Sequence, residues 1–238
     1  MPLPASFIAH LQSLGYHPRS NKHSDALATA IALDLVAHCP AIAEAARTGR
    51  IVYDLNFTIV VQRSDWNIDL GLGPPPPGAA GATPSGIVRA RPSTVQVAVE
   101  IKSVMTEHRK AVKNRKRDFE AHHEHAHEYN RRTIAAGVMV TNMSATFRSP
   151  LRTSETTHRN VESQVQHCLN EMRNVASRSG ESDNGLDAKT FIVVEMDNVN
   201  LDATRFVIRP PAPQIGDPLH YDAFIERICD TYTERFAR

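Results

Sequence analysis

The sequence predicts an α/β protein with a mixed central β-sheet flanked by helices. Two kinds of segment alternate along its 238 residues. One kind is rich in β-branched and apolar residues, as in buried strands, and the other carries apolar residues at helical spacing. Their order is helix, three strands, helix, strand, helix, strand, which is typical of a sheet covered by helices on both faces.

Five stretches have the periodicity of helices. Pro40 falls inside the second stretch and is expected to kink or split it. The very polar stretch after Met105 has a narrow apolar seam at Val112, Phe119 and Ala126, one residue every seven. The expected helices cover residues 4–17, 25–47, 105–132, 159–177 and 221–236.

The expected strands are short and mostly apolar. Residues 63–65 are expected to form a turn after the first strand, and Gly71 is expected to end the second strand. The predicted strands cover residues 51–62, 66–70, 95–102, 133–141 and 190–196, with a further one at 205–208.

We expect a single domain over residues 1–238. Its core spans about residues 25–197, and residues 198–238 form a C-terminal extension that carries the last helix. Residues 71–94 are rich in proline, glycine and alanine, which predicts a surface insertion without a core element.

The composition excludes several classes of protein. The net charge of +1 means that any nucleic-acid-binding surface must be local. Cys39, Cys168 and Cys229 are sparse and odd in number, which predicts no disulfide framework and a reducing cytoplasm. No leader-like start and no apolar run of about 20 residues is present, so we expect no membrane association and a cytoplasmic location.

Charged residues end the strand V-Q-V-A-V-E-I-K. Glu100 and Lys102 are two residues apart, so both side chains leave the same face of an extended strand. Asp69 ends the preceding strand. If the two strands are neighbours, Asp69 and Glu100 converge on one divalent cation, which also accepts the backbone carbonyl of Ile101 as a ligand. Lys102 would then orient or deprotonate an attacking water, or offset the charge of a phosphate.

The pattern D-(x)n-E-x-K on two neighbouring strands, within an αβββαβαβ order, resembles the PD-(D/E)xK nuclease superfamily, which includes type II restriction endonucleases. Ile68 stands where that superfamily usually has a proline. The resemblance implies a restriction-endonuclease-like core with Asp69, Glu100 and Lys102 as the catalytic residues. It also implies Mg²⁺ as cofactor, which Mn²⁺ can replace, and site-specific hydrolysis of double-stranded DNA. The alternative interpretation of Glu100 and Lys102 is an edge-strand ion pair, worth about 0.2–1 kcal/mol at a surface.

The polar helix that follows Lys102 is rich in cations, which suit a phosphate backbone. Asn114 and Arg117 have side chains that also read adenine and guanine, respectively. A solvated helix face without a ligand is the alternative. The residues expected to contact DNA are Arg109, Lys110, Lys113, Asn114 and Arg117, with Arg148 from a later loop.

The same helix contains a competing motif, His123-Glu124-His125-Ala126-His127, which has the H-E-x-x-H spacing of zinc peptidases. Polar residues flank it on nearly every side, so we expect the histidines to lie at the surface. A further carboxylate for a metal site is sought on the helix before the first strand, at Glu44 or Asp34.

The sequence therefore predicts a Mg²⁺-dependent endonuclease that cuts both strands of DNA. Two cuts need two sites, so a homodimer is expected, in contact through the N-terminal or the C-terminal helix. Two other functions remain open: a zinc-dependent peptidase that uses His123, Glu124 and His127, and a non-catalytic DNA-binding member of the same fold.

Overall fold

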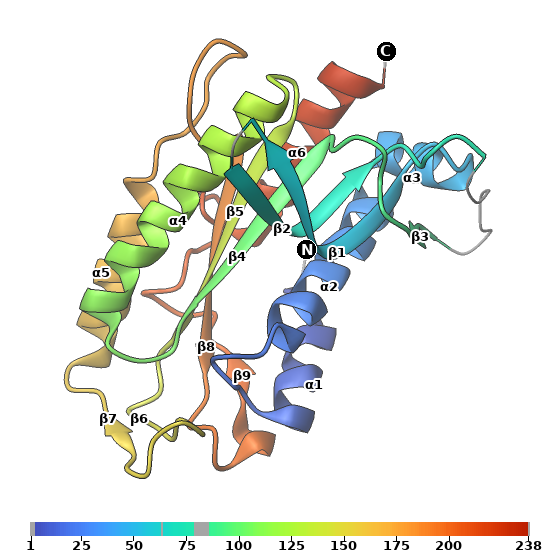
Figure 1. The fold of residues 1–238 in the computed structure, drawn as a ribbon. Coiled ribbons are helices and arrows are strands. Elements are labelled where there is room, and N and C mark those ends of the chain that lie inside the picture. Colours follow the sequence, from blue (N-terminus) through green and yellow to red (C-terminus); the bar gives the residue numbers. More distant parts are fainter. Residues whose placement is uncertain (1–2, 63, 79–85, 238) are drawn as a thin grey trace.

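The computed structural model describes residues 3–62, 64–78 and 86–237. Seven strands form one mixed sheet in the order β3-β1-β2-β4-β5-β8-β9, and β6 and β7 form a separate hairpin (Figure 1). The strands are β1 (Val52–Val61), β2 (Ser64–Gly73), β3 (Val88–Arg89), β4 (Val97–Val104), β5 (Ile134–Asn142), β6 (Thr146–Phe147), β7 (Thr156–Thr157), β8 (Ala188–Glu195) and β9 (Arg205–Phe206). The helices are α1 (Ala5–Leu14), α2 (Lys22–His38), α3 (Pro40–Arg47), α4 (His108–Tyr129), α5 (Val161–Arg173) and α6 (Tyr221–Phe236), with a 3-10 turn at Leu201–Ala203.

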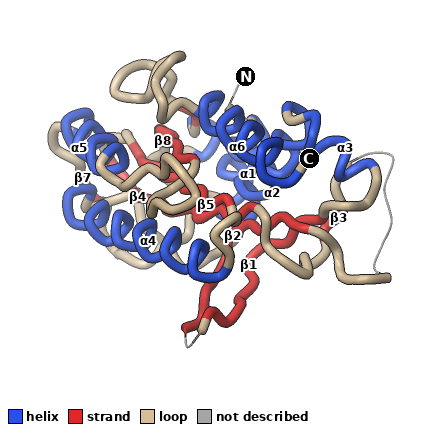
Figure 2. The backbone as a smooth tube through the Cα atoms, turned by 90° about the horizontal axis from the view of Figure 1, so that it is seen from above, coloured by secondary structure: helices blue, strands red, loops and turns tan. Residues whose placement is uncertain are grey.

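The predicted fold class is confirmed. Strands β4, β5 and β8 are parallel and are joined through α4 and α5, whereas β1, β2 and β4 pair in antiparallel fashion. Helices α4 and α5 cover one face of the sheet, and α1, α2, α3 and α6 cover the other (Figure 2). The sheet is thus the middle of three layers.

Each face of the sheet has its own apolar core. On the α2 and α6 side, Leu27 and Ile228 pack with Val99 of β4. On the α4 and α5 side, the predicted seam of Val112, Phe119 and Ala126 is buried. The alternation of β4 between these two cores leaves Glu100 and Lys102 on the α4 side, with Ala98 and Val104.

The helices differ from the prediction mainly at their ends. The predicted break at Pro40 is present, because Pro40 is the first residue of α3 and Cys39 separates it from α2. No single helix in the described ranges has the length and apolar character needed to cross a membrane; only α2 and α3 taken together do, and they are bent by 100°.

Strand β2 is longer than predicted, because it begins in the expected turn and continues through Gly71 to Gly73. A Cβ atom at Gly71 would lie 2.5 Å from the Phe57 ring, and one at Gly73 would lie 1.8 Å from the backbone oxygen of Thr94. The two glycines therefore permit close packing instead of ending the strand. Strand β3 lies within the predicted insertion and pairs with β1; residues 79–85 of that insertion, and residue 63 of the expected turn, lie outside the described residues.

Two further segments were predicted wrongly. The loop after β5 contains β6, which pairs with β7. Strand β4 is displaced by two residues toward the C-terminus, so that Glu100 and Lys102 lie inside the strand and pair with Gly137 and Met139 of β5. In this register the backbone of both charged residues is held within the β4–β5 ladder.

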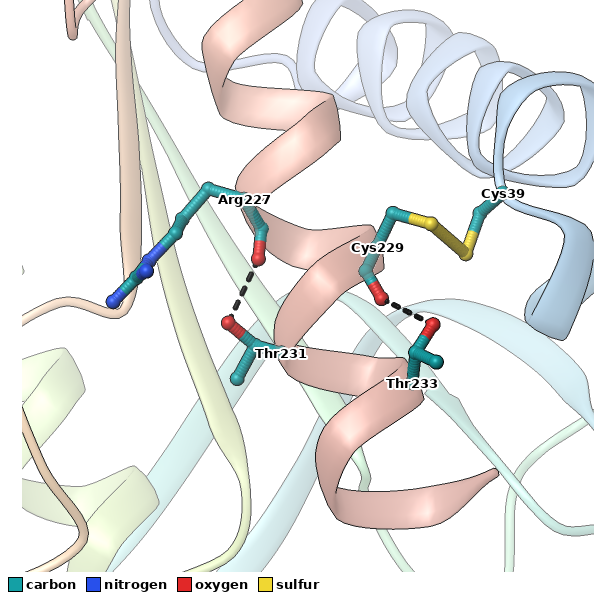
Figure 3. The surroundings of a disulfide bond; sticks show 5 residues. All are labelled: Cys39, Arg227, Cys229, Thr231 and Thr233. Atoms are coloured by element: carbon teal, nitrogen blue, oxygen red, sulfur yellow. Dashed lines mark hydrogen bonds between the residues drawn. A yellow bond between two sulfur atoms is a disulfide. The ribbon is translucent and has the colours of Figure 1, made fainter. Parts of the chain in front are cut away.

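The expectation of no disulfide is also wrong, since Cys39 and Cys229 are bonded, with their Cα atoms 5.3 Å apart (Figure 3). The break between α2 and α3 places Cys39 beside α6. Because 190 residues separate the two cysteines, their spacing in the sequence gives no sign of the pair. The bond removes the cysteine-based argument for a reducing compartment. Cys168 is free and buried.

Candidate active site

The site lies where β2 and β4 separate. Their ladder runs from Leu72–Val97 to Leu70–Val99, and Asp69 is the next residue of β2. The Oδ2 atom of Asp69 accepts the backbone N–H of Ile101 at 2.7 Å. The β2–β4 ladder has ended before Ile101, so the carboxylate takes the place of a backbone acceptor from β2.

A change of face in the β1–β2 pair places Asp69 at this position. Leu55 and its partner Leu70 belong to the core under α2, whereas Phe57 and its partner Ile68 belong to the core under α4. Asn56, between them, has a left-handed backbone with φ of 49°. The strand pair therefore rotates at Asn56, and Asp69 lies opposite that rotation.

The three predicted catalytic residues come together. The Lys102 ammonium is 3.8 Å from Oδ2 of Asp69 and in direct contact with Oε1 of Glu100. Both carboxylates are buried, and Lys102 is half-buried. Because both carboxylates are buried, the interpretation as a solvated ion pair at the surface is wrong.

Burial and neighbouring charges set the protonation of the site. Burial raises the pKa of Glu100 to about 7, and the charge of Asp69 adds to this effect while Lys102 opposes it. Burial also raises the pKa of Asp69. For Lys102, burial acts to lower the pKa, but the attraction of Glu100 and Asp69 outweighs it, so its pKa is raised. Lys102 is therefore an ammonium at neutral pH.

A neutral histidine lies beside Glu100. Nε2 of His122 lies 3.2 Å from the carbonyl oxygen of Ala98, which can only accept, so this nitrogen carries the proton. Nδ1 then accepts the indole N–H of Trp66 at 3.3 Å and lies 3.8 Å from Oε2 of Glu100. Burial lowers the pKa of His122 to about 3, so the ring adds no charge beside Glu100.

The nearby helical carboxylate is Asp25, and the two sequence candidates lie elsewhere. Glu44 is exposed and paired with Arg47, and Asp34 accepts the hydroxyl of Tyr221 at 2.7 Å. Asp25, in the first turn of α2, is close enough that its charge contributes to the raised pKa of Asp69. It also accepts the side-chain amide of Asn56. Sequence reasoning missed Asp25 because it was interpreted only as the start of a helix.

The site opens into a cavity of about 150 Å³. Asp69 and Lys102 line it from the sheet, Ser24 lines it from α2, and Arg115 lines it from α4. Arg115 was not among the predicted DNA contacts, although it is the cation of α4 that reaches this cavity. Its guanidinium pairs with Asp118 at 2.7 Å.

The donor set fits a hard divalent cation. The charge of Asp69 raises the pKa of the buried Glu100, and a cation between the two carboxylates would remove this repulsion. No group of three or more His, Cys, Asp and Glu side chains suited to a metal occurs within the described ranges. A cation held by Asp69 and Glu100 would therefore complete its coordination with the Ile101 carbonyl, water and phosphate, as Mg²⁺ commonly does.

The histidines of α4 are buried, contrary to the prediction. His122, His123 and His127 face the core because they share the helix face of Phe119 and Ala126. Nε2 of His127 lies 3.5 Å from Asp187.

Asp187 also accepts hydrogen bonds from Arg235 at 2.6 Å and from the backbone N–H of Ala135 at 2.9 Å. Glu124 is exposed, whereas His123 and His127 of the H-E-x-x-H motif are buried against the core. His127 lies beside the ion pair of Asp187 and Arg235.

The six predicted DNA contacts keep their place at the surface. All are exposed, and within the described ranges none of the five cations among them has an ion-pair partner, in contrast to Arg115, Lys116 and Arg152. They are Arg109, Lys110, Lys113, Asn114 and Arg117 on α4, and Arg148 after β6.

Comparison with known proteins gives no match: no protein-family model, curated protein or solved structure is detectably similar to the chain. The functional argument therefore depends on the geometry of the site.

Proposed function

We propose that the protein is a Mg²⁺-dependent endonuclease that hydrolyses phosphodiester bonds of double-stranded DNA, with Mn²⁺ as a possible substitute. The observation that supports this most is the contact among Asp69, Glu100 and Lys102, buried where two central strands separate. Two carboxylates and one ammonium beside an open cavity are the groups that metal-assisted phosphate chemistry needs. The resemblance of their spacing to PD-(D/E)xK nucleases agrees with this proposal.

Each residue has a distinct role in this proposal. Asp69 and Glu100, with the carbonyl of Ile101, would hold the cation, and Asp25 would add negative charge behind Asp69. When bound, the cation supplies Lewis acidity to the phosphate and lowers the pKa of water. Lys102, as an ammonium, orients the attacking water and offsets the negative charge that develops on the phosphate. This protonation state favours an electrostatic role for Lys102 over that of a general base.

The unpaired cations of α4 would contact the DNA backbone. Arg109, Lys110, Lys113 and Arg117 are exposed on the helix that covers the active-site face of the sheet, with Asn114 among them. Phosphate contacts of this kind fix the position of an enzyme on DNA without reading sequence. A homodimer remains our expectation, since cutting both strands at one site requires two copies of the active site.

DNA cleavage tests this proposal. Long genomic DNA is incubated with the protein and Mg²⁺, and the wild type is expected to produce discrete fragments. Glu100→Gln and Lys102→Met are expected to reduce the rate at least about 100-fold. Glu124→Gln, at an exposed position of α4, is the matched control, and this variant is expected to cut normally. Cleavage retained in both active-site variants, or an equal loss of cleavage in Glu124→Gln, would contradict the proposal.

A further inference from the structure

A second cavity adjoins the one that contains Asp69 and Lys102. It measures about 340 Å³, against about 150 Å³ for the first. The two share Tyr16, Pro18, Ser103 and Arg115 as lining residues, so they lie side by side. Any substrate group held at Asp69 and Lys102 therefore has an adjoining space into which the rest of the molecule can extend.

The shared wall is polar and suits a phosphate. The Tyr16 hydroxyl interacts with the Ser103 side chain and lies near the Arg115 guanidinium. Nε of Arg115 is buried and has no hydrogen-bond partner among the described residues. A buried donor without a partner costs free energy, which an acceptor oxygen from a ligand would recover. Together with Lys102, Arg115 places two cations around the smaller cavity.

The larger cavity has a different chemistry. Phe147, Val104 and Met105 contribute apolar atoms to a lining that also contains Thr106 and Ser149, and Leu151 lies at its rim with 47% of its surface exposed. The polar part of the rim is the ion pair of Glu107 and Arg152, whose atoms are 3.1 Å apart. The Glu107 carboxylate disfavours a second phosphate here. A cavity with a mixed apolar and polar lining, and with an acceptor and a donor at its rim, is instead suited to a nucleobase, which has apolar faces and a polar edge.

We propose that this larger cavity binds a nucleobase of the strand whose phosphate occupies the Asp69–Lys102 cavity. The inference rests on the proposed function, because it assumes that a phosphate lies there. The base would pack against Leu151 and present its polar edge to Glu107 and Arg152. A base stacked in a duplex does not reach such a cavity, so the nucleotide at the site is unpaired or is rotated out of the duplex. The substrate class is thereby narrowed to DNA with an unstacked nucleotide at the site of cleavage.

Binding of mononucleotides tests the inference without knowledge of a recognition sequence. The wild-type protein, in Mg²⁺ buffer, is titrated with each of the four 5′-deoxynucleoside monophosphates and with deoxyribose 5-phosphate, and amide chemical shifts are followed by NMR. At least one nucleotide is expected to bind about tenfold more tightly than the sugar phosphate, which corresponds to about 1.4 kcal/mol from the base.

Two tryptophan variants locate the binding. Leu151→Trp fills the rim of the larger cavity and is expected to remove the difference between nucleotide and sugar phosphate. Leu33→Trp, at a leucine of similar exposure on α2, is the control and is expected to keep it. Equal binding of all five compounds, or a base preference that survives in Leu151→Trp, would overturn the inference.

The failure of this inference differs from failure of the proposed function. Mg²⁺-dependent DNA cleavage without any base preference would overturn the base cavity and leave the nuclease proposal intact. A base preference that is lost in Leu151→Trp, in a protein that cuts no DNA, would support the cavity and contradict the nuclease proposal.

Discussion

The carboxylate of Asp69 accepts the backbone N–H of Ile101 at 2.7 Å, and this contact joins two strands at the point where they stop pairing. Because Ile101 lies between Glu100 and Lys102, the hydrogen bond fixes Asp69 relative to both. The geometry of the candidate site is therefore a consequence of the end of a strand ladder. The rotation of the β1–β2 pair at Asn56 also helps to fix the position of Asp69, which lies opposite Asn56.

The glycines of β2 keep this part of the sheet closed, and the first prediction concerns them. Gly73→Ala places a methyl group against the backbone oxygen of Thr94, where the ideal distance would be 1.8 Å. We expect a loss of about 1–3 kcal/mol in the free energy of unfolding, measured with urea. Gly180→Ala is the control, since its nearest neighbour is 3.7 Å away, and it is expected to leave stability nearly unchanged. An equal effect of the two substitutions would contradict the packing argument.

Acid destabilisation is expected to involve His122. Its folded-state pKa of about 3 lies below the unfolded value of about 6.5, so the unfolded state binds the extra proton between these limits. The stability contributed by the neutral ring is present above pH 6.5 and is lost as the pH falls toward 3. The loss amounts to about 2 kcal/mol between pH 7 and pH 5.

Urea unfolding at these two pH values measures this loss. His122→Gln, which keeps a donor for Ala98 but does not titrate, is expected to lose about 2 kcal/mol less than the wild type on acidification. The same pH dependence of the unfolding free energy in both proteins would show that protonation of His122 does not destabilise the folded state.

Cation binding is expected to depend on the protonation of Glu100. Its pKa of about 7 means that a cation must displace a proton below that pH. The affinity for Mn²⁺, measured by calorimetry, is therefore expected to rise about tenfold between pH 6 and pH 8. Glu100→Gln is expected to bind more weakly with little pH dependence. An affinity that falls as the pH rises would contradict the proposed ligand.

The basic face of α4 is expected to control the salt dependence of DNA binding. Lys110→Gln, Lys113→Gln and Arg117→Gln together are expected to reduce the slope of log affinity against log salt by up to about 3, or roughly 0.9 per phosphate contact. Fluorescence anisotropy with duplex DNA and no divalent cation measures this slope. Arg47→Gln, an arginine already paired with Glu44, is the control and should not change it.

The elements that the sequence predicted well are those with clear local patterns. Residues 221–236 are amphipathic throughout, and the final helix has the predicted bounds. The charges of Glu100 and Lys102 interrupt an apolar strand, so the sequence alone identified them as candidates. Asp69 became a candidate because its strand was expected to lie next to theirs, as it does. Local periodicity therefore identified the candidate catalytic residues.

The features that the sequence did not reveal depend on contacts between distant segments. Asp25 and Asp69 approach only because α2 packs over β2 and β4. The Cys39–Cys229 bond spans 190 residues, and the neighbour of His127, Asp187, lies 60 positions further along the chain. Gly71 was interpreted as the end of a strand, since its role depends on the Phe57 ring across the ladder.

The binding of Mn²⁺ tests the central claim most directly, because it needs no knowledge of a DNA sequence. The claim is that Asp69 and Glu100 jointly hold one divalent cation. Calorimetry at pH 8 is predicted to show one site in the wild type, weakened at least about tenfold in Asp69→Asn and in Glu100→Gln and unchanged in Glu124→Gln. Wild-type affinity in both active-site variants would contradict the account.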